Sequence, residues 1–132
     1  MSDDFPRLSH DRELQNGFED LLRAFEIIYD EYEKEHAPSL DKEFLHMNRH
    51  LWAQEAVRLF DRLYAEPNLD TSSMPEWIQE ISGAVRRVAV RLRQQRDVTE
   101  GEAHHYFEGG ATMLAVAVEQ MRQVKKYRRS PS

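Results

Sequence analysis

The chain contains 132 residues, 40% hydrophobic and 32% charged, with a formal net charge of −6, and this length allows one compact domain over residues 1–132. It has no cysteine, which excludes disulfide frameworks, thiolate metal sites and cysteine nucleophiles. No apolar run reaches the ~20 residues of a membrane span, and the acidic N-terminus is unlike a signal peptide, so we expect a cytoplasmic protein without a membrane partner.

The first two predicted helices follow apolar residues that recur every three or four positions. The first helix covers about residues 11–36 and ends before Pro38, because a residue that precedes proline is disfavoured in the α region. The second helix covers residues 41–65 and ends before Pro67. The polar run 68–73 that follows is the longest predicted loop.

The last two predicted helices each begin at a capping-box sequence, in which Ser or Thr is followed three residues later by Glu. Ser73–Glu76, with a proline inside it, starts the helix predicted over residues 74–95. Thr99–Glu102 starts the helix predicted over residues 100–128. Four amphipathic helices of matched length and short connections predict an all-α protein, a single up-down-up-down antiparallel four-helix bundle.

Two adjacent glycines, Gly109 and Gly110, lie inside the fourth predicted helix, where each glycine costs about 1 kcal/mol relative to alanine. Gly110 belongs to the predicted apolar face of this helix, together with the small residues Ala103 and Ala117 and with Met121. One interpretation is that Trp52 or Trp77 fills the space that Gly110 leaves, because protein interiors are close-packed. A helix kink, a small-molecule pocket and a tight dimer seam are the alternatives.

Five of the six histidines would lie at one end of an up-down-up-down bundle. Imidazoles and carboxylates that are one helical turn apart can bind a divalent metal. The candidate ligands at this end are His36, His46, His50, His104 and Glu108. The alternatives are solvated or capping histidines, and a pH-responsive cluster of imidazoles that repel one another when protonated.

Charge is unevenly distributed along the chain. Residues 1–43 contain 13 acidic and 5 basic residues, whereas residues 81–132 contain 5 acidic and 10 basic ones. These charges form either solvated faces with cross-helix ion pairs or a surface that guides a partner or a second copy of the chain. The candidate partner-binding residues are Arg86, Arg87, Arg91 and Arg93 on the third helix and Glu19, Glu26, Asp30 and Glu33 on the first.

No arrangement typical of a catalytic site occurs in the sequence, and no predicted core stripe contains a carboxylate. The negative net charge disfavours nucleic-acid binding. We therefore expect a non-enzymatic protein–protein interaction module without a cofactor, a small regulator, adaptor or inhibitor that binds another protein through charged helix faces and forms a homodimer. The alternative hypothesis is a helical bundle that binds a metal or small ligand at its histidine-rich end.

Overall fold

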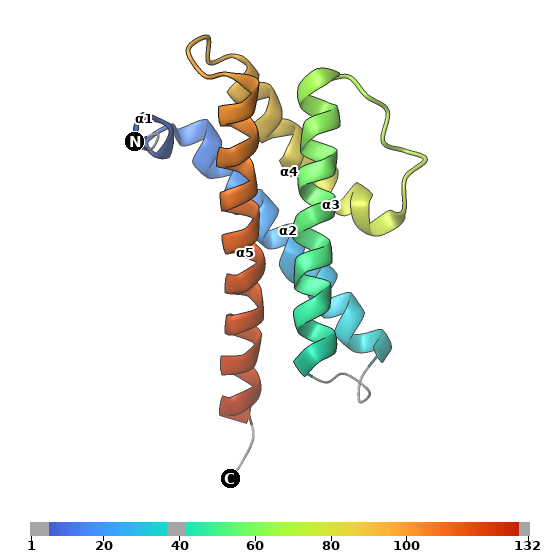
Figure 1. The fold of residues 1–132 in the computed structure, drawn as a ribbon. Helices are drawn as coiled ribbons and strands as arrows, with labels where there is room; N and C mark the ends of the chain where they lie inside the picture. Colours follow the sequence, from blue (N-terminus) through green and yellow to red (C-terminus); the bar gives the residue numbers. More distant parts are fainter. Residues whose placement is uncertain (1–5, 37–41, 130–132) are drawn as a thin grey trace.

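The computed structural model describes the backbone of residues 6–36 and 42–129 and the side chains of residues 8–31 and 51–121. A short helix, α1 (Pro6–Ser9), precedes four long ones, α2 (Arg12–His36), α3 (Lys42–Ala65), α4 (Glu76–Arg93) and α5 (Glu100–Arg129) (Figure 1). No strand occurs in these residues. The all-α prediction is confirmed, and the long helices begin and end within two residues of the expected positions.

The helices that pack most closely are not consecutive in the chain. The most extensive contacts join α2 to α4 and α3 to α5, and further contacts join α3 to α4 and α2 to α5. Within the described residues, α4 and α5 touch only slightly, and no comparable contact joins α2 to α3. Segment 66–75 runs back beside α3, so that α3 and α4 end on the same side of the molecule (Figure 1). The fold is a helical bundle, but the up-down-up-down order is not confirmed.

This returning segment, residues 66–75, is held by hydrogen bonds within itself and by hydrogen bonds from α4. The amide of Leu69 donates to the carbonyl of Glu66 at 3.0 Å, and the amide of Ser72 donates to Oδ1 of Asp70 at 2.9 Å. Arg86 of α4 donates to the carbonyl oxygens of Pro67 and, at 2.8 Å, of Leu69. The segment is therefore an ordered connection that places the start of α4 away from the end of α3.

The two predicted capping boxes have different outcomes. At the start of α5, the amide of Glu102 donates to Oγ1 of Thr99 at 3.1 Å and the amide of Thr99 donates to Oε1 of Glu102 at 2.8 Å, which confirms the second box. The first box is wrong: Pro75 precedes α4, and no side chain caps the helix. Instead, Nε2 of Gln79 donates to the carbonyls of Ser72 and Met74 at 3.0 and 2.7 Å.

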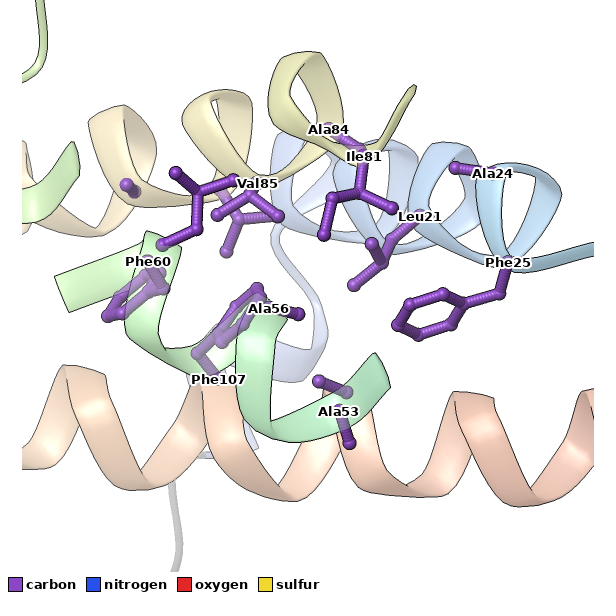
Figure 2. Close-up of a cluster of buried hydrophobic side chains, with 14 of the residues drawn as sticks. Leu21, Ala24, Phe25, Ala53, Ala56, Phe60, Ile81, Ala84, Val85 and Phe107 are labelled. Carbon is purple, nitrogen blue, oxygen red and sulfur yellow. The ribbon is translucent and has the colours of Figure 1, made fainter. Parts of the chain in front are cut away.

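The hydrophobic core lies between the four long helices. Figure 2 shows side chains from all four that point into one interior, among them Leu21, Phe25, Ala56, Phe60, Ile81, Val85 and Phe107. Phe60 and Phe107 stack with ring centroids 4.4 Å apart and 9° between their planes, and Phe18 stacks on Phe107 at 5.9 Å. Because burying a large apolar side chain contributes about 1.5–3 kcal/mol, this core supplies most of the stabilisation.

Gly110 permits the close approach of α2 to α5. A Cβ atom on this glycine would lie 2.5 Å from Cε1 of Phe18, well inside van der Waals contact. The space expected at Gly110 is therefore filled, but by Phe18 and not by a tryptophan. Trp52 instead packs edge-to-face against Tyr29, with ring centroids 5.7 Å apart, and Trp77 is only half-buried. Helix α5 continues through the glycine pair.

The core-facing side of α5 contains one carboxylate, which contradicts the expectation that the core stripes lack them. Every fourth residue from Ala103 to Glu119 is buried, and the Glu119 side chain is 7% exposed and has an interaction partner. The prediction followed a heptad-like stripe through Ala117 and Met121. The helix packs instead along an i±4 ridge, which is inclined to the helix axis and brings Glu119 inside.

We expect Gly110→Ala to destabilise the protein although alanine is the better helix former. Overpacking costs about 1–3 kcal/mol, whereas alanine gains about 1 kcal/mol in a helix interior. The matched control is Gly83→Ala in α4, where a Cβ would have no atom within 4 Å. The free energy of unfolding from urea titrations should fall in Gly110→Ala and rise in Gly83→Ala. Equal effects in the two variants would contradict the role given to Phe18.

Candidate interaction surfaces

The four arginines predicted to contact a partner all bind groups of the protein's own chain. Arg87 and Arg91, one turn apart on α4, bind carboxylates of α2 and of the turn before it. Arg86 and Arg93 bind backbone carbonyls of the returning segment and of α3. Arg87 and Arg91 therefore form cross-helix ion pairs, which is the alternative that the sequence left open to a partner-binding surface.

Arg87 binds two carboxylates of α2 at once. Its Nε and Nη2 donate to the two carboxylate oxygens of Glu13 at 3.0 and 3.1 Å, and its Nη1 donates to Oδ2 of Asp20 at 2.8 Å. The hydrogen bond from Arg87 lowers the pKa of Glu13, and the two carboxylates raise the pKa of Arg87. The bidentate geometry fixes the position of α4 along α2.

Asp11 has two structural roles. Its Oδ1 accepts a hydrogen bond from the amide of Leu14 at 3.1 Å, as an N-cap residue does at the start of α2. Its Oδ2 accepts hydrogen bonds from Arg91, at 2.8 Å from Nη2, and from Gln95 at 3.3 Å. The Arg91 hydrogen bond is the largest cause of the lowered pKa of Asp11. We define the α2–α4 ionic seam as Asp11, Glu13, Asp20, Arg87 and Arg91.

The other two arginines of α4 bind neutral groups. Arg93 donates to the carbonyl of Tyr64 and lies 5.9 Å from the centre of its ring. The last four carbonyls of a helix have no partner within it, so Arg93 caps the end of α3. Arg86, with its two carbonyl partners, holds the returning segment. These contacts are structural, and sequence reasoning missed them because their partners are backbone atoms.

The predicted acidic residues of α2 lie on one outer face, at spacings of seven, four and three residues. Glu19 is exposed, Glu26 and Asp30 are half-exposed, and the Glu33 side chain lies outside the described residues. Asp30 has an interaction partner within the chain. Over the described side chains, Glu19 and Glu26 form no ion pair. We call these four residues the acidic face of α2.

The histidines do not gather as the sequence predicted. Nδ1 of His104 lies 2.8 Å from Oδ1 of Asp61. Asp61 follows His50 by eleven residues on α3, a distance of about 16 Å along the helix axis, so His104 lies toward the other end of α3 from His46 and His50. The predicted gathering of histidines at one end depended on the up-down-up-down order, which is not confirmed.

The side chains of His36, His46 and His50 lie outside the described residues, and a metal site among them stays a prediction. Among the side chains that the structure does describe, no group of three histidine or acidic residues could hold a metal ion. Glu108, the other candidate ligand, lies with His104 and Asp61 in an open groove between α3 and α5. The Asp61 hydrogen bond, together with the charges of Asp61 and Glu108, raises the pKa of His104.

Comparison with protein-family models, with curated proteins and with solved structures found no match. In the described part of the chain, none of the helices has the length and apolarity that crossing a bilayer requires. The geometry of the surfaces therefore carries the functional argument.

We expect Asp11→Ala to lower the free energy of unfolding at pH 7. An N-cap acid contributes about 0.5–2 kcal/mol, and the loss of the Arg91 hydrogen bond adds to that effect. The pKa of Asp11 is lowered on folding, so its contribution is present above the ordinary value of 3.8 and is lost as the pH falls through the lowered value. The free energies of unfolding of the wild type and the variant, from urea titrations, should therefore converge as the pH falls below the ordinary value of 3.8. Glu31→Ala, at an exposed position of α2, is the control. An effect of Asp11→Ala no larger than that of Glu31→Ala would contradict the role of the cap and the seam.

The pair of His104 and Asp61 predicts the opposite dependence near neutral pH. Because the pKa of His104 is raised on folding, its contribution is complete below the ordinary value of 6.5 and is lost as the pH rises through the raised value. We expect Asp61→Asn to remove this part of the stability change and to lower the pKa of His104 in an NMR titration. An unchanged pKa in Asp61→Asn would rule out the pair.

Proposed function

We propose that the protein is a protein–protein interaction module, without catalytic activity, that binds a basic surface of another protein through the acidic face of α2. A small regulator, adaptor or inhibitor works in this way. The observation that carries the proposal is the division of the acidic residues near the N-terminus into two sets. Asp11, Glu13 and Asp20 are neutralised by α4, whereas Glu19 and Glu26 face solvent without an ion pair over the described side chains.

Electrostatics supports a basic partner. The net charge of −6 and the row of carboxylates on one helix face produce a negative potential there. Complementary charges increase the rate of association and select among partners, and salt screens them over a Debye length of about 8 Å at physiological ionic strength. Binding through this face should therefore be fast and sensitive to salt.

The arginines of the ionic seam have no part in this proposal. Arg87 and Arg91 are half-buried, and their donor groups are directed at carboxylates of the same chain. A partner that bound them would displace Glu13 and Asp11 from their hydrogen bonds, which leaves those carboxylates unpaired. Reversal of these arginines would therefore disturb the fold and would not test binding alone.

The test is co-purification from the native host followed by mass spectrometry, with wild-type protein and Glu19→Lys/Glu26→Lys. We expect the wild type to retain one or more basic proteins at low salt and the double variant to lose them, because the sign of the face is reversed. The control is Glu66→Lys/Glu80→Lys, which makes the same change in net charge at exposed positions outside α2. Equal recovery by Glu19→Lys/Glu26→Lys and the wild type would contradict the proposal.

A further inference from the structure

We draw no further inference here: the strongest candidate, the open groove between α3 and α5 where Asp61, His104 and Glu108 lie together, rests on two carboxylates that have histidine neighbours of the same chain, and nothing in the structure shows what would occupy it.

Discussion

The ionic seam between α2 and α4 determines how the rest of the chain is arranged. Its carboxylates and arginines are separated by about seventy to eighty residues of sequence, and they meet in pairs with distances of 2.8–3.0 Å. Exposed ion pairs contribute little to stability one at a time. Their geometry, however, selects the helix against which α2 packs and the register of that packing. The apolar core stabilises the bundle, and the ionic seam fixes how α4 packs along α2.

The seam also determines which charges remain for other molecules. The sequence shows that the first third of the chain is acidic and the last third is basic. This distribution is equally consistent with ion pairs inside the protein and with a binding surface. In the structure Asp11 and Glu13 form internal ion pairs, whereas Glu19 is exposed and Glu26 half-exposed. Over the described side chains, Glu19 and Glu26 of the acidic face of α2 are therefore carboxylates that the fold does not use in ion pairs.

Local sequence signals predicted the elements well, and distant contacts could not be predicted from them. Apolar periodicity and prolines place the helix ends, and the capping box of Thr99 and Glu102 involves only neighbours. The path of the segment between α3 and α4 involves Arg86, which binds carbonyls 17 and 19 residues away, and no pattern of side chains encodes these contacts. The partner of Gly110 was likewise predicted as a tryptophan, because the sequence shows that space exists but not which helix faces it.

Helix α5 shows why a single predicted stripe was insufficient. One set of its residues recurs at every fourth position and packs into the core, and another recurs at spacings of four, three and four and faces outward. A prediction that assigns one apolar stripe to each helix merges the two sets and places Met121, 39% exposed, in the core. The two adjacent glycines differ in the same way: Phe18 fills the space at Gly110, which belongs to the inner side of the helix, whereas a Cβ on Gly109 would meet no atom of the described chain within 4 Å.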